Sequence, residues 1–400
     1  MTPETPFTKR IRRHVTGRVR NYFAATAPNF ENLCYDELMN LPLSVKDAMI
    51  VQGGVEFKGR LQDCWLANLN LRTANRILMR IGEFKATNFT QLEKKLSEIP
   101  WELFITPVPG TDFPPQVSAS SKHSRLYHKD AVAKRFKASI ENCFAHTESA
   151  DQDSSNALLF SQKIFVRATD DHFTVSIDSS GEILYKRGIK TGTGKAPVRE
   201  TTGAAVLKLA GYKPGEPLID PMCGSGTFSL EGAMMAANIP PGWFRNFAFM
   251  GWPSFSTKRW AYIKRESEKQ FIKTGKPHIF ASDKNKTPCD TVEKTVEKYG
   301  LSHVIKVCHN DFFEFSPSDL TSRTGLVVIN PPYGHRIGTK QESDRLFYEI
   351  STHLKKEYRG WKIALIAPDK KLVHKFPLKT ISHYFYHGGL KLVLLTGKIL

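Results

Sequence analysis

A strand that runs into a glycine turn and then a helix is the feature that most constrains the fold of this chain. Residues 217–219 are a short apolar run that ends at Asp220, Gly224 and Gly226 lie in the turn, and residues 227–237 have a strong helical pattern. Glycines allow tight turns and close approach of a ligand, and the free N–H groups of a helix start favour a carboxylate. The sequence therefore predicts a nucleotide-type loop in an α/β domain.

The glycine turn differs from two common nucleotide-binding motifs. The dinucleotide fingerprint has a third glycine three residues after Gly226, where this chain has Ser229, and no Walker lysine follows the turn. The pattern therefore argues against NAD. Cys223 lies inside the turn, where a thiol nucleophile is conceivable, but we interpret it as a small packing residue.

Acidic residues follow successive strand-like segments. Asp220 ends the first segment, Asp283 follows residues 278–282, and Asp311 follows residues 304–308 after two intervening residues. Open α/β sheets bind ligands beyond the carboxyl ends of their strands. Asp283 could therefore accept hydrogen bonds from both hydroxyls of a ribose, and Asp311 could accept from an adenine amine. Any one such aspartate could equally be a helix N-cap.

A fourth strand-like run, residues 325–329, leads into Asn330, Pro331, Pro332 and Tyr333. The two prolines make this turn stiff and leave its carbonyl groups free to accept hydrogen bonds. The Asn330 side-chain oxygen and the Pro331 carbonyl could each accept one hydrogen of an exocyclic amine, while the Tyr333 ring stacks on the base. The alternative is a simple strand-terminating turn, since Asn-Pro and Pro-Pro are common in loops.

These motifs resemble those of the class I methyltransferases that use S-adenosylmethionine and methylate amines. The similarity is greatest to the guanine-N2-methylating half of the bacterial large-subunit ribosomal RNA methyltransferases of the RlmL type. The segments that carry it are residues 187–190, 196–201, 218–227, Asp283, Asp311, 330–334 and the aromatic stretch 240–252. The chain departs from the family at Arg199, where lysine is frequent, and at residues 387–389, where the family often has an Asn-Gly turn.

The resemblance implies a Rossmann-like methyltransferase domain with a mostly parallel seven-stranded sheet, one active site, S-adenosylmethionine as cofactor and no metal. Asn330, Pro331, Pro332 and Tyr333 would be the catalytic residues that hold the target amine. The implied cofactor-binding residues are Pro197, Thr201, Asp220, Cys223, Gly224, Gly226, Asp283, Asp311 and Asn330.

The front part of the chain has a mixed α and β pattern, unlike the later strand–helix alternation. We expect strands at 21–26, 48–51, 54–57, 116–120, 163–167 and 172–177, and helices at 29–39, 61–81 and 130–143. Together with the resemblance, this divides the chain into a basic flexible arm (1–20), a ferredoxin-like segment (21–60), a THUMP RNA-binding domain (61–180) and the methyltransferase domain (181–400). The arm contains six Lys and Arg residues and one acid, Glu4.

Basic residues cluster around the expected helix at 130–143, with Tyr127 and Phe136 between them. We expect RNA contacts from Lys122, Arg125, Lys129, Lys134 and Arg135. Interleaved cations and aromatic rings suit single-stranded or looped RNA through phosphate contacts and stacking. A solvated helix face is the alternative.

Composition is consistent with an RNA partner. The chain has 57 Lys and Arg against 39 Asp and Glu, a formal net charge of +18, which predicts a polyanionic partner. The 6 cysteines contain no CxxC pair, which argues against zinc and for a reducing compartment. No apolar run reaches the ~20 residues of a membrane span, so we expect a cytoplasmic protein without a membrane partner.

We therefore expect a methyltransferase that modifies the N2 amine of a guanine, with 23S ribosomal RNA favoured over transfer RNA. The alternatives are a transfer RNA guanine-N2 methyltransferase and a non-catalytic RNA-binding assembly factor. Methylation of a glutamine amide in a protein shares the Asn-Pro-Pro-Tyr motif, and the basic front part weighs against it.

Overall fold

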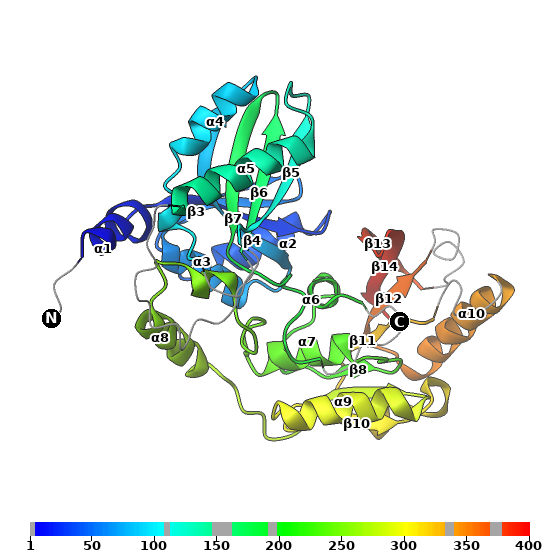
Figure 1. Ribbon diagram of the computed structural model, residues 1–400. Helices are drawn as coiled ribbons and strands as arrows, with labels where there is room; N and C mark the ends of the chain where they lie inside the picture. The colour runs from blue at the N-terminus through cyan, green and yellow to red at the C-terminus, as the bar shows by residue number, and fades with distance from the viewer. Residues whose placement is uncertain (1–4, 108–112, 146–161, 191–197, 333–339, 369–377) are drawn as a thin grey trace.

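The computed structural model describes residues 5–107, 113–145, 162–190, 198–332, 340–368 and 378–400. Within them the chain forms two α/β halves, each built on one seven-stranded sheet (Figure 1). The front half contains β1 (Arg20–Thr26), β2 (Asp47–Val51), β3 (Gly54–Gly59), β4 (Ala74–Lys85), β5 (Gln116–Lys122), β6 (Lys163–Thr169) and β7 (His172–Asp178). Its helices are α1 (Pro6–Ile11), α2 (Glu31–Met39), α3 (Leu61–Asn70), α4 (Phe89–Ser97) and α5 (Lys129–Phe144).

The second half contains the remaining strands, β8 (Leu218–Asp220), β9 (Ile279–Asp283), β10 (Ile305–His309), β11 (Leu326–Ile329), β12 (Lys362–Ala367), β13 (Thr380–His387) and β14 (Leu390–Lys398). Its helices are α6 (Glu200–Leu209), α7 (Thr227–Ala236), α8 (Thr257–Glu268), α9 (Lys286–Lys298) and α10 (Lys340–Glu357). None of the helices in the described ranges is long and apolar enough to cross a membrane.

The front sheet has the strand order β2-β3-β1-β4-β7-β6-β5. The β1-α2-β2-β3-α3-β4 succession is a ferredoxin-like unit, and β4 continues it by pairing with β7. The boundary that we expected at residue 60 falls between β3 and α3, inside this unit. The reason is that β4, which follows α3, pairs with β1 and is the last strand of the ferredoxin-like unit.

The expected single helix at 61–81 is wrong, because α3 ends at Asn70 and β4 begins at Ala74. The backbone N–H groups of Arg72 and Thr73 donate to the Glu37 carboxylate, which holds the turn between the two elements. β4 then pairs with β1 on one side and β7 on the other. Pairing with two strands outweighs the helical propensity of the segment.

The basic stretch at the start of the chain also differs from the mobile arm that we expected. Residues 6–16 are helical, first as α1 and then as a π-helical turn from Arg12 to Thr16. Ile11 and Val15 are buried in the core of the front half. They lie four residues apart, which places them on one face of a helix, so the apolar spacing decides the structure and the charges occupy the outer face.

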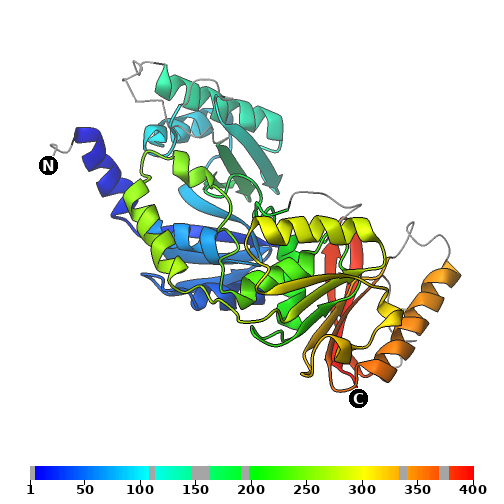
Figure 2. The same ribbon diagram turned by 90° about the horizontal axis from the view of Figure 1, so that it is seen from below.

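The second sheet has the order β10-β9-β8-β11-β12-β14-β13 and is mostly parallel, as expected. β8 to β12 are parallel, and only the pairings of β14 with β12 and β13 are antiparallel. Residues of α6, α7 and α9 pack in the core on one face, and residues of α10 pack in the core on the other (Figure 2). The sheet is therefore the middle layer of three.

A buried carboxylate joins the two halves. Glu231 in α7 has no exposed side-chain surface, and its Oε1 lies 2.8 Å from Nε of Arg187 in the connecting segment. Its Oε2 lies 3.5 Å from Arg72 of the front half, and Arg187 also donates to the Arg72 carbonyl oxygen at 2.7 Å. Two guanidinium groups from different parts of the chain therefore meet on one carboxylate of α7.

Aromatic side chains of the second half complete the core of the front half. Phe247, Phe249 and Trp252 are buried in the front core cluster. The Phe249 ring stacks on Trp65 of α3 with ring centres 5.5 Å apart. The aromatic stretch noted in the sequence is therefore a packing surface between the halves.

Replacing Glu231 with alanine should strongly destabilise the protein. The Glu231→Ala variant removes the carboxylate that pairs with the buried Arg187 and with Arg72, and breaking a buried ion pair in this way costs about 3–5 kcal/mol in comparable cases. The measurement is the midpoint of urea unfolding. Glu349→Ala is the control, since Glu349 pairs with Arg345 on the exposed face of α10 and its loss should cost at most ~1 kcal/mol. Equal effects of the two substitutions would contradict this account of the interface.

Candidate active site

The carboxyl ends of β8, β9 and β11 bring three predicted residues to one edge of the second sheet. Asp220 ends β8, Asp283 ends β9, and Asn330 directly follows β11. β8 lies between β9 and β11, and the chain leaves β8 toward β9 but leaves β11 toward β12. This reversal is the switch point where open α/β sheets bind their ligands.

The two glycines of the loop after β8 have different roles. Both have positive φ angles, +52° at Gly224 and +73° at Gly226, which other residues rarely adopt. A Cβ at Gly226 would lie 2.8 Å from a methyl of Val292, so this glycine lets α9 pack against the loop. A Cβ at Gly224 would meet nothing within 4 Å, so Gly224 borders open space at the edge of the sheet.

Asp283 supports the glycine loop from the neighbouring strand. Its Oδ2 accepts a hydrogen bond from the Gly224 N–H at 3.1 Å, and its Oδ1 accepts from the Asn285 N–H at 2.9 Å. The Cys223 N–H also donates to the Ser282 carbonyl oxygen, so the loop is fixed to β9 at two points. A half-buried carboxylate has further lone pairs, so Asp283 can still accept from hydroxyl groups of a ligand.

Asp220 is a fully buried carboxyl group with one oxygen free of partners. Its Oδ2 accepts from the N–H and the hydroxyl of Ser229, at 3.2 and 2.7 Å. Its Oδ1 is buried and has no hydrogen-bond partner in the described part of the chain. Burial raises the pKa of Asp220 to about 7, and the nearby Asp283 adds to this increase. The site therefore holds an acid poised to change charge near neutral pH.

Ser229 is a site residue that the sequence reasoning used only to exclude another motif. It occupies the position of the missing third glycine, and both of its polar groups bind Asp220. A hydroxyl residue in the first turn of a helix, close to an acid that ends the preceding strand, is the sequence signal that could have identified Ser229.

Asn330 presents a buried acceptor toward the same edge. Its Oδ1 is buried and has no hydrogen-bond partner in the described ranges. Pro331 is buried and Pro332 is exposed, while Tyr333 lies outside the described residues. A buried amide oxygen without a partner is costly in free energy, and a ligand that donates a hydrogen bond to it would remove that cost.

Other predicted cofactor residues have internal partners. The Asp311 carboxylate accepts from the Phe313 N–H at 3.0 Å and caps a 3-10 helix that begins at Phe312, which was the alternative role weighed for it. The Thr201 hydroxyl donates to Asn75 in β4 at 2.9 Å. Pro197 lies outside the described residues.

Lys190 and Val198 contact the start of α7. The Lys190 ammonium lies 2.7 Å from the Thr227 hydroxyl and 2.9 Å from the Glu200 carboxylate. The Thr227 hydroxyl donates to the Val198 carbonyl oxygen at 3.0 Å. These contacts place residues on both sides of the undescribed 191–197 stretch against the glycine loop, and Lys190 adds a cation to the site.

Cys223 has the environment of a packing residue. Its side chain is buried, and the neighbouring Cys289 together with burial raises the pKa of the Cys223 thiol well above its usual value. A protonated thiol is a poor nucleophile, so the structure is consistent with the packing role that we assigned to it. No group of His, Cys, Asp and Glu side chains in the described ranges could hold a metal ion.

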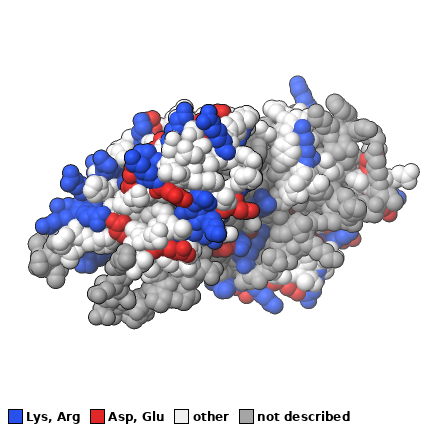
Figure 3. Space-filling view, turned by 45° about the horizontal axis from the view of Figure 1, so that its top comes forward, with Lys and Arg blue, Asp and Glu red and all other residues white. Residues whose placement is uncertain are grey.

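The expected RNA-binding residues divide into two groups. Lys122, Arg125, Lys129 and Lys134 are exposed on β5, α5 and the loop between them. Arg135 instead lies over the Phe89 ring, 3.7 Å from its centre, and pairs with Glu93 of α4. Arg135 thus joins α4 to α5. On the surface of the front half, Lys and Arg side chains are spread out with acidic side chains between them (Figure 3).

The aromatic residues in this cluster also differ from each other. Phe136 is fully buried, so it cannot stack on RNA, whereas Tyr127 is 64% exposed. Of the aromatic residues expected to stack on RNA, only Tyr127 is exposed, and it lies among the four exposed cations Lys122, Arg125, Lys129 and Lys134.

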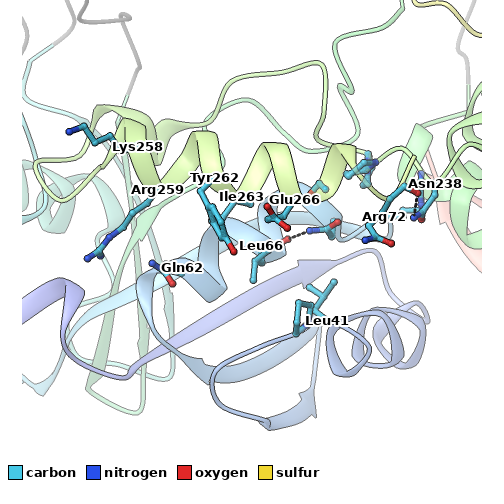
Figure 4. A pocket seen from close by; sticks show the side chains of 16 residues that line it. Leu41, Gln62, Leu66, Arg72, Asn238, Lys258, Arg259, Tyr262, Ile263 and Glu266 are labelled. Carbon is cyan, nitrogen blue, oxygen red and sulfur yellow. Dashed lines mark hydrogen bonds between the residues drawn. The ribbon is translucent and has the colours of Figure 1, made fainter. Parts of the chain in front are cut away.

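A groove of 720 Å³ lies elsewhere, between α3 and α8 (Figure 4). Leu66 and Gln62 of α3 form one side, and Tyr262 and Arg259 of α8 form the other. None of the residues predicted for catalysis or cofactor binding lines this groove. The groove is therefore separate from the candidate active site.

The sequence matches two family models. Residues 187–389 match the model described as "RMKL-like, methyltransferase domain", and residues 21–78 match the RlmL ferredoxin-like domain. The fold and the site thus define a class I methyltransferase. The chain belongs to the RlmKL-like methyltransferase family.

Relatives of known description agree with this assignment. The chain is 29% identical over 95% of its length to the ribosomal RNA large subunit methyltransferase K/L of Psychromonas ingrahamii, and 31% identical over 93% to the one of Methylococcus capsulatus. It spans about half the length of these relatives (50%). It is also 29% identical to a Synechocystis protein named "Putative RNA methyltransferase", with 94% of this chain and 96% of the relative covered.

Solved structures have the same arrangement of both halves. One, described as "a putative methyltransferase complexed with SAH", has a TM-score of 0.81 and 28% identity and covers 96% of this chain and 99% of its own. Another, "a predicted N6-adenine-specific DNA methylase" from Listeria monocytogenes, has a TM-score of 0.81 and 27% identity and covers 95% of this chain and 96% of its own.

The buried Asp220 should make stability depend on pH. Its pKa of about 7 in the folded state exceeds the ~3.9 of an ordinary aspartate, so between these values the folded protein holds a proton that the unfolded chain lacks. The contribution of Asp220 to the free energy of unfolding is therefore lost as the pH rises from about 4 to about 7. The Asp220→Asn variant cannot titrate, so its stability relative to wild type should rise by roughly 1 kcal/mol or more between about pH 4 and 7 and change little above that.

The measurement is urea unfolding of both proteins across this pH range, with Asp290→Asn of α9 as the control. A difference between wild type and Asp220→Asn that stays constant with pH would show that Asp220 keeps an ordinary pKa.

Proposed function

We propose that the chain transfers a methyl group from S-adenosylmethionine to the N2 amine of a guanine in large-subunit ribosomal RNA. The observation that carries the proposal is the buried, unpartnered Asn330 Oδ1 at the switch point of the sheet. The family membership and the names of the relatives support a ribosomal RNA substrate. The choice of guanine rests on the sequence resemblance, since any exocyclic amine could donate to the same acceptors.

The residues of the loop fit S-adenosylmethionine. Gly224 leaves open space beside β8, Asp283 has lone pairs left for ribose hydroxyls, and Asp220 Oδ1 is a buried oxygen without a partner in the described ranges, next to the loop. When bound, the cofactor supplies an electrophilic methyl group on a cationic sulfur. An ionised Asp220 would favour a positively charged ligand beside it through simple Coulomb attraction.

Asn330 and Pro331 would act on the amine. The guanine amine shares its lone pair with the ring and is a poor nucleophile. If the Asn330 Oδ1 and the Pro331 carbonyl each accept one of its hydrogens, the lone pair is directed away from the ring plane toward the cofactor side. The acceptors are held on a stiff turn, so positioning and electrostatics do most of the catalytic work. Tyr333 would add a stacking surface for the base, which lowers the cost of flipping the nucleotide out.

The front half would hold the RNA. Exposed Lys122, Arg125, Lys129 and Lys134 form a cationic surface with the exposed Tyr127 ring, as expected for a THUMP-type RNA-binding domain. Cations release counterions from RNA phosphates, and the exposed ring offers stacking to an unpaired base.

The experiment that tests the function is transfer of labelled methyl groups from S-adenosylmethionine to total RNA and total protein of a strain that lacks the gene. We expect label in large-subunit ribosomal RNA and, after digestion, in N2-methylguanosine. Label in transfer RNA, in protein or in another nucleoside would show that the proposed substrate is wrong. Absence of label in all fractions would show that the proposed activity is wrong.

The Asn330→Ala variant should lower the rate of methyl transfer by roughly 10²-fold or more, as is typical when a preorganised polar partner is lost. Cofactor affinity, measured by calorimetry, should change little because the glycine loop is intact. The Asn330→Asp variant keeps an acceptor oxygen and should be faster than Asn330→Ala. Near-normal turnover of Asn330→Ala would remove Asn330 from the amine site.

The Asp283→Ala variant should instead weaken the binding of S-adenosylmethionine. The substitution removes an acceptor for the ribose and the partner of the Gly224 N–H. Hydrogen bonds to charged groups are each worth ~1.5–3 kcal/mol, so we expect the dissociation constant to rise about 10-fold or more. Calorimetry measures it, with Glu293→Ala on the exposed face of α9 as the control. Equal affinities of Asp283→Ala and wild type would exclude a ribose contact.

A further inference from the structure

The hairpin of β13 and β14 extends beyond its neighbour at the edge that carries the active site. β14 pairs with β12 up to the pair of Ala367 with Val393. The pairing of β14 with β13 continues through Leu392, Lys391 and Leu390. Because β12 is parallel to β11, the end of β12 lies at the same edge as Asn330. The tip of the hairpin therefore projects past the strand ends on the side of the amine site.

This tip carries exposed groups that suit RNA. Tyr386 is 49% exposed and lies directly opposite the exposed Lys391, and Leu390 is 57% exposed. Directly opposite residues of antiparallel strands point to the same face, so Tyr386 and Lys391 share one surface. On this face the Lys391 ammonium lies 5.5 Å from the centre of the Tyr384 ring. A ring beside a cation is the combination that binds unpaired nucleotides, by stacking and by phosphate contact.

The hairpin is also anchored to the front half. The Phe385 side chain is buried and stacks on Phe30, with ring centres 6.0 Å apart. The Asn29 side chain donates to the Tyr384 carbonyl oxygen at 2.9 Å. These contacts tie the hairpin to the half that would bind RNA, while Tyr386, the residue after Phe385, points to the opposite face of the sheet.

We propose that the hairpin tip, formed by Tyr386, Leu390 and Lys391, binds the unpaired RNA segment that flanks the target nucleotide. Tyr386 stacks on a neighbouring base and Lys391 contacts its phosphate. β14 is the second strand from β11, a lateral separation of roughly 10 Å that one or two nucleotides can span. This inference rests on the proposed function, because it takes RNA as the substrate.

The test compares substitutions at the two ends of the same hairpin. Tyr386→Ala and Lys391→Gln change the tip. Ile381→Ala and Lys398→Gln change exposed residues near the opposite end of β13 and β14, and serve as matched controls. The binding of the full chain to a short single-stranded RNA and to the duplex of the same sequence is measured over a range of salt concentrations. Methyl transfer to ribosomal RNA gives KM and kcat for each variant.

We expect Tyr386→Ala to weaken single-strand binding on the order of 10-fold, to raise KM similarly and to leave duplex binding unchanged. Tyr386→Trp, which keeps a stacking ring, should restore single-strand affinity. Lys391→Gln should reduce the slope of log affinity against log salt by roughly 0.7, the value for one phosphate contact on a single strand. Both controls should behave as wild type.

The proposal is overturned if Tyr386→Ala and Ile381→Ala bind single-stranded RNA equally well, or if Tyr386→Ala loses duplex affinity to the same extent. Absence of single-strand binding by the wild type overturns it as well. Failure of the proposed function looks different: the wild type then transfers no methyl group to RNA, whatever the order of the binding affinities.

Discussion

The buried carboxylate of Glu231 is the constraint on which the geometry of the site depends. It pairs with both Arg187 and Arg72, so removal of this carboxylate leaves two largely buried guanidinium groups without their shared partner. Arg187 lies three residues before Lys190, which contacts Thr227 at the start of α7, and Arg72 precedes β4. One charge cluster thus fixes the helix after the glycine loop relative to the half of the protein that would bind RNA.

The same helix connects this cluster to the chemistry. Near its start, Ser229 binds the buried Asp220, and Gly226 allows α9 to pack against the loop. Asp283 then holds the loop from β9. The loop is thereby supported from both neighbouring elements, while Asp220 Oδ1 and Asn330 Oδ1 stay unsatisfied in the described part of the chain. Burying these two oxygens without a partner costs free energy. A ligand that forms hydrogen bonds with them would remove this cost and bind more tightly.

The sequence predicted the sheet edge well because its signals are local. Each acid follows its own strand, and the glycines and prolines determine the turns where they occur. Contacts between distant segments were not predictable in this way. The local pattern of residues 61–81 is helical, and only the pairing of β4 with β1 and β7 makes its second part a strand. Arg135 resembled an RNA contact because its partner Phe89 lies far upstream in the sequence. Asp311 fits two roles on sequence grounds, and only its hydrogen bond to Phe313 identified the cap.

The aromatic stretch between α7 and α8 determines how the chain can be divided. Phe247, Phe249 and Trp252 belong to the core of the front half, although they follow the glycine loop in the sequence. A fragment cut between the two sheets would expose these rings on one piece and leave Trp65 uncovered on the other. Each piece would then present an apolar surface that promotes aggregation. The second sheet therefore cannot be separated from the front half without removing part of the front core.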